Sequence, residues 1–447
     1  MKSILYVVTL LLGISSTMAQ SQTVRLYGSL KDLKLQEVIL KYDGATAFIS
    51  DKGDVVIPVN SDGTFNIEFP IEKPGYYSIR RNPLYLTPGD EMKIDIKEIP
   101  ELSTFEGKGA EVNRYLSTRF YPKGGSYLNA GKYSFPDFNK TKRAIDSIMT
   151  KRRAELVALK CTPEFRELEE VRIKADMLQS IYYYPAYNGR NMFPANCTKE
   201  EATKIRSDFF QGQKEVVEPV LRELASSDAY VDIEVVRYAL LLYSDLKLFD
   251  FKLSDRLEEL QEAYYTAAKL NNKEITPVLY KEVNDYISTM KYGDFREALS
   301  FRLERRAKLM EGRPAPDIEL SDIQGNKTKL SDYKGNVLYV DFWATWCAPC
   351  RAETPFFNAL SEKYPNIRFI AVSIDEKRAL WENEVKGGNH GRVIELLSDD
   401  NELRAKWDVI GIPRFLLIDE NFNIINSSAP RPSEKASIEP LLEKYSH

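Results

Sequence analysis

Two cysteines three residues apart, Cys347 and Cys350, lie in the stretch "FWATWCAPCRAETP" (342–355). Such a pair can be a redox dithiol, half of a metal site or a structural disulfide. Zinc needs four ligands, and the other cysteines and histidines form no second close pair. A structural disulfide across so short a separation removes little chain entropy. The spacing therefore favours thiol–disulfide exchange, and no metal site is predicted.

The surrounding pattern predicts where the two sulfurs lie. The near-continuous apolar run 337–343 is typical of a strand that is buried on both faces, and a helix is expected from about residue 349 to residue 363. Cys347 then falls at the helix N-terminus, where free N–H groups and the helix dipole favour a thiolate. Cys350, one turn into the helix, can attack a mixed disulfide formed on Cys347.

Length, charge and composition indicate packed globular domains and no nucleic-acid binding. The chain has 447 residues, a formal net charge of -4 and 43% hydrophobic residues, which fits two or three packed domains. Acidic and basic residues are interspersed, so no basic patch for nucleic acid is expected.

The N-terminal residues have the three-part pattern of a secretory signal peptide. Lys2 is followed by the apolar run 4–12 and by small residues that allow cleavage after Ala19. The run is shorter than the ~20 residues that a membrane-spanning helix needs, so no stable membrane insertion is expected. The sequence thus predicts a signal peptide over 1–19 and a soluble, periplasmic protein.

Three regions follow the signal peptide. Alternating apolar segments with turn signals predict an N-terminal β-sandwich over 23–104, an accessory domain. Helical periodicity predicts a central all-α domain over 105–311. The prolines of "MEGRPAPDIEL" end it, and the order of the segments over 312–447 predicts an α/β thioredoxin-like domain with a hairpin, alternating strands and helices, a late strand pair and a final helix. The expected fold class is therefore multidomain.

The C-terminal region resembles the TlpA/ResA-type thiol–disulfide oxidoreductases of the redoxin superfamily, which are exported bacterial proteins. The resemblance covers 312–447 and is carried by "GRPAPD" (312–317), the Trp-Cys-x-x-Cys core and "GIPRFLLID" (411–419). It implies a thioredoxin-like catalytic domain that needs no cofactor beyond a redox-active Cys347–Cys350 disulfide.

The resemblance also implies roles for single residues. Pro413 matches the family's cis-proline, which with Ile412 faces the cysteines and pairs with substrate; the alternative is a trans proline that opens an edge strand. Glu353 matches an acid near the buried cysteine, although a solvated glutamate in the first turns is the alternative. Asp341 matches the buried acid of thioredoxins, and such a group in an apolar strand is costly unless it transfers a proton to or from Cys350.

These roles combine into a mechanism. The Cys347 thiolate attacks a substrate disulfide, Asp341 and Glu353 take the proton of Cys350, and Cys350 then releases the reduced substrate. Trp346 presents an apolar surface to substrate. The partners implied are protein disulfide substrates and a membrane thiol reductase that returns electrons. The direction expected from the resemblance is reduction.

Other functions remain open at this point. The superfamily also contains thiol peroxidases, although 343–345 lacks their proline. A non-catalytic binding protein with a thioredoxin-like domain is a further alternative. A structural disulfide between Cys161 and Cys197 is one interpretation and a second relay pair is another, although neither cysteine has a visible activating context, and the sequence leaves open whether they pair at all. His390 is interpreted as a loop residue.

Overall fold

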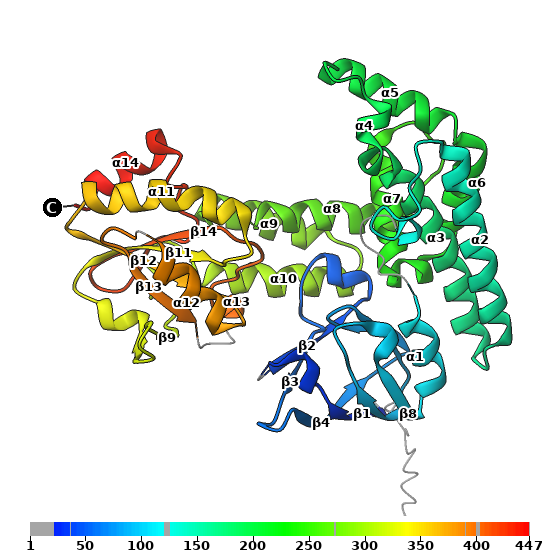
Figure 1. Ribbon diagram of the computed structural model, residues 1–447, viewed down its shortest axis with the longest axis horizontal. Coiled ribbons are helices and arrows are strands. Elements are labelled where there is room, and N and C mark those ends of the chain that lie inside the picture. The colour runs from blue at the N-terminus through cyan, green and yellow to red at the C-terminus, as the bar shows by residue number, and fades with distance from the viewer. Residues whose placement is uncertain are drawn as a thin grey trace, which may run out of the picture.

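The computed structural model describes residues 22–35, 37–119, 126–271, 274–388, 390–398 and 403–446. These residues form an N-terminal β region, a run of helices and a C-terminal α/β region (Figure 1). The predicted signal peptide over 1–19 lies outside the described residues. In those ranges no helix is long and apolar enough to cross a membrane.

The N-terminal β region consists of two four-stranded sheets, with strand orders β4-β1-β7-β8 and β3-β2-β5-β6. Leu26 of one sheet and Leu40 of the other belong to the same hydrophobic cluster. Six of the strands match the alternating segments of the sequence, whereas β6 and β8 do not. Pro83 in β6 and Gly107 in β8 weaken the strand pattern, and both strands lie at sheet edges, where such residues are tolerated. The strands span β1 Gln22–Ser29, β2 Glu37–Tyr42, β3 Val55–Pro58, β4 Thr64–Ile71, β5 Gly75–Ile79, β6 Asn82–Leu86, β7 Glu91–Asp95 and β8 Thr104–Lys108.

Helices follow from residue 110 to residue 307. Side-chain caps explain several starts: Thr162 caps α3, and Thr198 forms a capping box with Glu201 at α5. In Figure 1, α8, α9 and α10 extend from the other helices to the C-terminal region. The helices span α1 Ala110–Ser117, α2 Phe138–Ala158, α3 Pro163–Tyr187, α4 Gly189–Met192, α5 Lys199–Gln211, α6 Lys214–Leu224, α7 Glu234–Leu246, α8 Asp255–Lys269, α9 Pro277–Thr289 and α10 Gly293–Ala307.

The C-terminal region is a thioredoxin-like domain built on a seven-stranded sheet of order β10-β9-β13-β12-β11-β14-β15. Every residue of the central strand β11 is buried, as the apolar run predicts. Alternate residues of the sheet pack on α11 and α14 on one face and on Leu309 and Trp407 on the other. The elements span β9 Glu319–Ser321, β10 Lys327–Lys329, β11 Val337–Trp343, α11 Ala348–Lys363, β12 Ile367–Ser373, α12 Arg378–Gly387, β13 Ile394–Ser398, α13 Leu403–Lys406, β14 Arg414–Ile418, β15 Ile424–Asn426 and α14 Lys435–Lys444.

Strand β13 is an element that the sequence does not predict. It has five residues, and Glu395, a poor strand former, lies inside it. Its parallel pairing with β12 and its antiparallel contact with β9 supply the stability that local propensity lacks.

The thioredoxin-like domain is joined to α10 by buried charges. The fully buried Asp408 carboxylate lies 2.5 Å from the Arg305 guanidinium and 3.6 Å from that of Arg306. Nearby, Arg414 donates a hydrogen bond of 3.2 Å to the carbonyl oxygen of Asn271, just after α8. Because buried charges are costly without partners, these contacts hold the domain against the helices.

Candidate active site

Strand β11 carries Asp341 into the centre of the sheet, beside Ala371 of β12 and Phe415 of β14. Asp341 is 3% exposed. Burial, and after it the nearby Glu395 and Glu353 charges, hold the pKa of Asp341 well above its ordinary value. Within the described ranges its Oδ1 has no hydrogen-bond partner. Asp341 is therefore the buried acid that the sequence predicts, and its environment suits a group that exchanges a proton.

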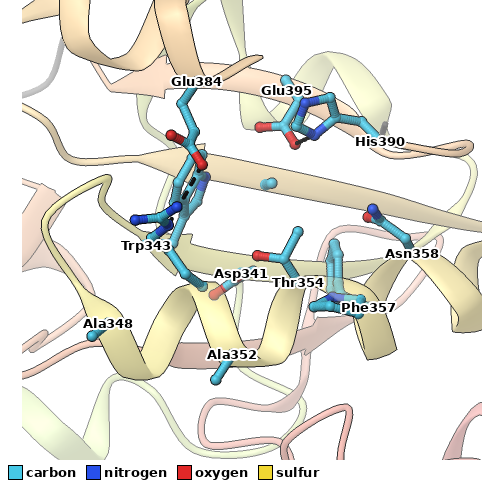
Figure 2. A pocket seen from close by; sticks show the side chains of 13 residues that line it. Asp341, Trp343, Ala348, Ala352, Thr354, Phe357, Asn358, Glu384, His390 and Glu395 are labelled. Carbon is cyan, nitrogen blue, oxygen red and sulfur yellow. Dashed lines mark ion pairs between the residues drawn. The ribbon is translucent and has the colours of Figure 1, made fainter. Parts of the chain in front are cut away.

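Asp341 opens onto a pocket of about 570 Å³ between the sheet, α11 and α12 (Figure 2). Arg351 and Glu384 form an ion pair of 3.5 Å within the pocket lining. In Figure 2, Asp341 lies beside α11, and Glu395 and His390 lie across the pocket from it. The pocket joins the buried acid to the helix that carries the cysteines.

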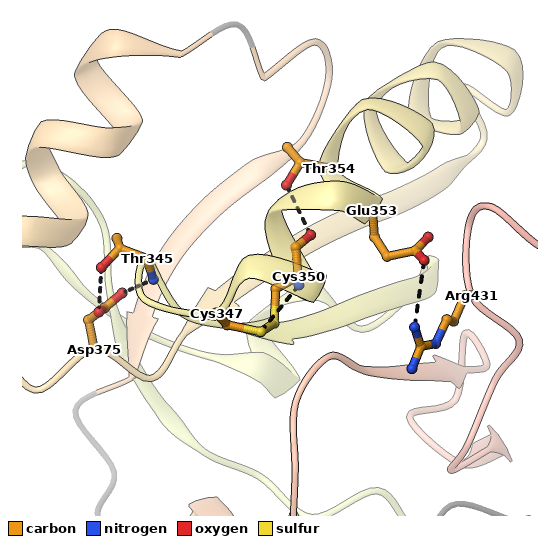
Figure 3. Close-up of a disulfide and its surroundings, with 7 residues drawn as sticks. All are labelled: Thr345, Cys347, Cys350, Glu353, Thr354, Asp375 and Arg431. Carbon is orange, nitrogen blue, oxygen red and sulfur yellow. Dashed lines mark hydrogen bonds and ion pairs between the residues drawn. A yellow bond between two sulfur atoms is a disulfide. The ribbon is translucent and has the colours of Figure 1, made fainter. Parts of the chain in front are cut away.

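Cys347 and Cys350 form a disulfide at the start of α11 (Figure 3). Cys347 is the N-cap residue, and its sulfur accepts a hydrogen bond of 3.2 Å from the backbone N–H of Cys350. Cys347 is 5% exposed and Cys350 is fully buried. In the dithiol form, the same N–H and the helix dipole favour a thiolate on Cys347. The geometry thus gives Cys347 the nucleophile's position and Cys350 the resolving position.

The loop before the cysteines is held by Asp375, which follows β12. Its carboxylate accepts hydrogen bonds of 2.8 Å from both the N–H and the hydroxyl of Thr345. The next residue, Glu376, forms an ion pair of 3.0 Å with Arg80 in the turn between β5 and β6. Sequence reasoning missed both contacts, although the shared edge at which parallel strands β11 and β12 end is a signal that could have found Asp375.

Glu353 lies one turn after Cys350 and is 6% exposed, so the alternative of a solvated glutamate is wrong. Its carboxylate accepts hydrogen bonds of 3.0 Å and 2.9 Å from the N–H and hydroxyl of Ser433. Arg431 lies 3.9 Å away (Figure 3). The side chain is thereby held toward the loop before α14.

The residues expected to bind substrate are Trp346, Ile412 and Pro413. Trp346 is 63% exposed, and Ile412 and Pro413 are half-buried. The Ile412–Pro413 bond is cis, so the alternative of a trans proline is wrong. An exposed indole next to the nucleophile offers apolar surface to a substrate chain.

Cys161 and Cys197 are free, and both are half-buried. The alternative of a structural disulfide between them is therefore wrong. Burial raises the pKa of the Cys161 thiol, which disfavours the thiolate that a relay cysteine needs.

His390 does lie in a loop, between α12 and β13, but it is not an isolated loop residue. Its Nδ1 lies 2.8 Å from Oε1 of Glu395 in β13. The sequence gives no sign of this pair, because β13 itself is not predicted.

Comparison with known proteins agrees with this geometry. The redoxin family matches residues 310–442. The chain is 30% identical over 142 residues to the thiol-disulfide oxidoreductase ResA of Bacillus thuringiensis, a match that covers 31% of this chain and 81% of the relative. It is 30% identical over 120 residues to the thioredoxin-like protein YneN of Bacillus subtilis, covering 26% and 70%.

A crystal structure of a Bacteroides vulgatus protein assigned to the thiol–disulfide oxidoreductases is 43% identical, with a TM-score of 0.30, and the match covers 31% of this chain and 99% of that one. Because the match to ResA covers most of that relative, and the acid and the cysteine pair lie as described above, the chain belongs to the ResA-type thiol–disulfide oxidoreductases of the redoxin family.

Proposed function

We propose that this protein is exported to the periplasm and reduces disulfides of exported proteins with the Cys347–Cys350 dithiol, with no further cofactor. The observation that carries the proposal is the position of Cys347 at the N-cap of α11. Its sulfur forms a disulfide with the buried Cys350. A thiolate is favoured at Cys347, and the buried Cys350 is protected from competing thiols.

The reaction proceeds in two exchanges. The Cys347 thiolate attacks one substrate sulfur, forms a mixed disulfide and releases the other substrate sulfur as a thiolate. Cys350 then loses its proton to the Asp341 carboxylate and attacks Cys347, which releases the second substrate sulfur. The enzyme dithiol is oxidised by two electrons, and the substrate thiolates take up protons from solvent. Glu353 supports this step through its charge.

Substrate polypeptides bind beside the exposed Trp346 indole and the backbone at Ile412 and Pro413. The N-terminal β-sandwich and the all-α domain are accessory to this site and fix its orientation. Their contacts with Asp408 and Glu376 support this role, because both residues lie in loops of the catalytic domain. A membrane thiol reductase returns electrons to the Cys347–Cys350 disulfide.

The thiol peroxidase and binding-protein alternatives receive no comparable support. A peroxidatic cysteine normally stands alone, whereas Cys347 has a partner three residues away. A protein that only binds partners has no need of a buried acid with a raised pKa such as Asp341.

Reduction of insulin by the full-length protein tests the proposal, in a chain with Cys161→Ser and Cys197→Ser so that only one thiol pair reacts. The dithiol form should reduce insulin, Cys347→Ser should be inactive, and Cys350→Ser should accumulate a mixed disulfide seen by mass spectrometry. A reduction potential near the ~−270 mV of thioredoxin is expected, whereas a value near ~−120 mV would reverse the direction. Removal of residues 1–19 should keep the protein in the cytoplasm.

A further inference from the structure

One wall of the pocket beside α11 contains a row of three residues on neighbouring strands. Asp341 of β11 is the Cα partner of Ala371 of β12, which in turn is the Cα partner of Glu395 of β13. All three line the pocket. Neighbouring strands lie about 4.8 Å apart, so the two acidic residues are about 10 Å apart across Ala371. The alanine methyl group leaves the space between the two carboxyl groups open.

Glu395 forms a pair with His390, which lies in the loop before β13. His390 Nδ1 lies 2.8 Å from Glu395 Oε1, and its Nε2 lies 3.0 Å from the carbonyl oxygen of Val385. A carbonyl oxygen only accepts, so Nε2 carries a proton, and the carboxylate favours a second proton on Nδ1. The Glu395 partner accordingly raises the pKa of His390.

Exposure increases from Asp341 to the Glu395–His390 pair. Asp341 is 3% exposed, whereas the side chains of Glu395 and His390 are 10% and 17% exposed. Among the described residues, Asp341 Oδ1, Glu395 Oε2 and Trp343 Nε1 lack hydrogen-bond partners, and all three residues line the pocket. A pocket of about 570 Å³ with such polar groups has room for bridging water.

We propose that Glu395 and His390 relay protons between Asp341 and solvent, and so act as positioning residues in the resolving step. The inference rests on the proposed function of Cys350. When Cys350 attacks Cys347, its S–H proton goes to the Asp341 carboxylate, the new S–S bond forms, and the substrate sulfur leaves as a thiolate. The Asp341 proton then passes through pocket water to Glu395 and His390 and on to solvent. In the reverse reaction the same route returns a proton to the Cys350 thiolate.

Other charged groups around the relay have separate partners or lie outside the row. Glu384 pairs with Arg351 in the pocket lining, and the Glu353 carboxylate is held by Ser433 in the loop before α14. The groups that interact electrostatically with Asp341, Glu395 or His390 are Tyr339 of β11, Glu353 of α11 and Glu384 of α12.

The test measures proton delivery without a substrate protein. Dithiothreitol reduces the Cys347–Cys350 disulfide of the full-length enzyme, and stopped-flow tryptophan fluorescence follows the reaction at low buffer concentration. The variants are Glu395→Gln and His390→Ala, the second at a half-buried loop position where folding is least disturbed. The matched control is Glu439→Gln, whose carboxylate pairs with Lys363 at 2.7 Å, outside the pocket lining.

Both relay variants should slow the reduction by about tenfold or more at neutral pH, as loss of general acid catalysis does. Added imidazole should restore the rate of His390→Ala. Glu395→Gln should shift the limb of the pH profile that reports Asp341 to lower pH, because the Glu395 charge raises the pKa of Asp341. The control should keep the wild-type rate and profile.

The relay is overturned if both variants react at the wild-type rate with an unchanged pH profile. It is also overturned if His390→Ala is slow and imidazole restores nothing, since His390 would then be structural. An enzyme that reacts with dithiothreitol but leaves insulin oxidised would refute the proposed function and not the relay.

Discussion

The carboxylate of Asp375 accepts two hydrogen bonds of 2.8 Å from Thr345, one from its backbone N–H and one from its hydroxyl. Thr345 is two residues before Cys347, and Asp375 follows the neighbouring strand β12. The pair therefore fixes the loop that presents the nucleophile.

Replacing Asp375 with Ala should loosen this loop. Hydrogen bonds to a charged group contribute about 1.5–3 kcal/mol each, so the free energy of unfolding should fall by about 2 kcal/mol or more. Urea denaturation measures the fall, and reaction with dithiothreitol measures the effect on Cys347. The control is Asp322→Ala. It removes an exposed carboxylate that accepts a hydrogen bond from Asn326 in a turn, and it should change the reaction rate little. Equal reactivity of the two variants would contradict the role of Asp375.

Replacing Asp341 with Asn should stabilise the protein at neutral pH. Burial raises the pKa of Asp341 in the folded chain. Above about pH 4 the folded chain therefore still binds a proton that the unfolded chain has released. Because of this difference, the free energy of unfolding falls as the pH rises through the folded-state pKa. An Asn side chain does not titrate, so the Asp341→Asn variant does not lose this stability as the pH rises. The variant should gain about 1–3 kcal/mol of unfolding free energy at neutral pH and nothing below about pH 4.

The same variant should react more slowly. Without a carboxylate to take the proton of Cys350, release of substrate from the mixed disulfide should slow by about 100-fold. Quenched-flow alkylation of the free thiols measures this step. An Asp341→Asn enzyme with neither the stability gain nor the slower release would contradict the assignment of Asp341 as a buried proton acceptor.

Replacing Trp346 with Ala should weaken binding of protein substrates and leave the chemistry intact. Loss of an exposed aromatic anchor typically costs about 2 kcal/mol, so kcat/KM for insulin should fall by more than about tenfold. The rate with a small aromatic disulfide should stay within about twofold, because a small disulfide has no chain to lay on the indole. Val278→Ala, at an exposed apolar side chain of α9, is the control. Equal losses with both substrates would contradict the binding role.

Replacing Asp408 with Asn should separate the thioredoxin-like domain from α10. Removing one partner of a buried ion pair costs about 3–5 kcal/mol, because Arg305 and Arg306 are left buried without it. Limited proteolysis should then cut between α10 and β9 much faster. Glu297→Gln, which removes the exposed partner of Lys52, should leave the cleavage rate unchanged. An uncut Asp408→Asn chain would show that apolar packing alone holds the domains.

Local pattern was enough for the chemistry of the cysteines. The apolar run of β11 followed by Cys347 and a helix determines a sulfur at a helix N-terminus, because strand burial and helix capping depend on neighbouring residues. The same local logic marks Asp341 as an unusual acid, since its neighbours in the run are apolar. The cis bond before Pro413 was predicted from the resemblance to a family and not from the local sequence pattern.

What lies beside these residues depends on strand order and domain docking. The alignment of Asp341 with Glu395 across Ala371 requires β11, β12 and β13 to be neighbours in register, and local propensity does not reveal the five-residue β13. The Asp375–Thr345 pair joins positions 30 residues apart, and the Asp408–Arg305 pair joins two parts of the chain with different periodicity. The sequence alone determined the cysteine pair, its place after the strand and the acid within that strand, and so predicted which residues react. Only the tertiary structure decided what surrounds them, because those contacts come from packing between segments distant in the chain.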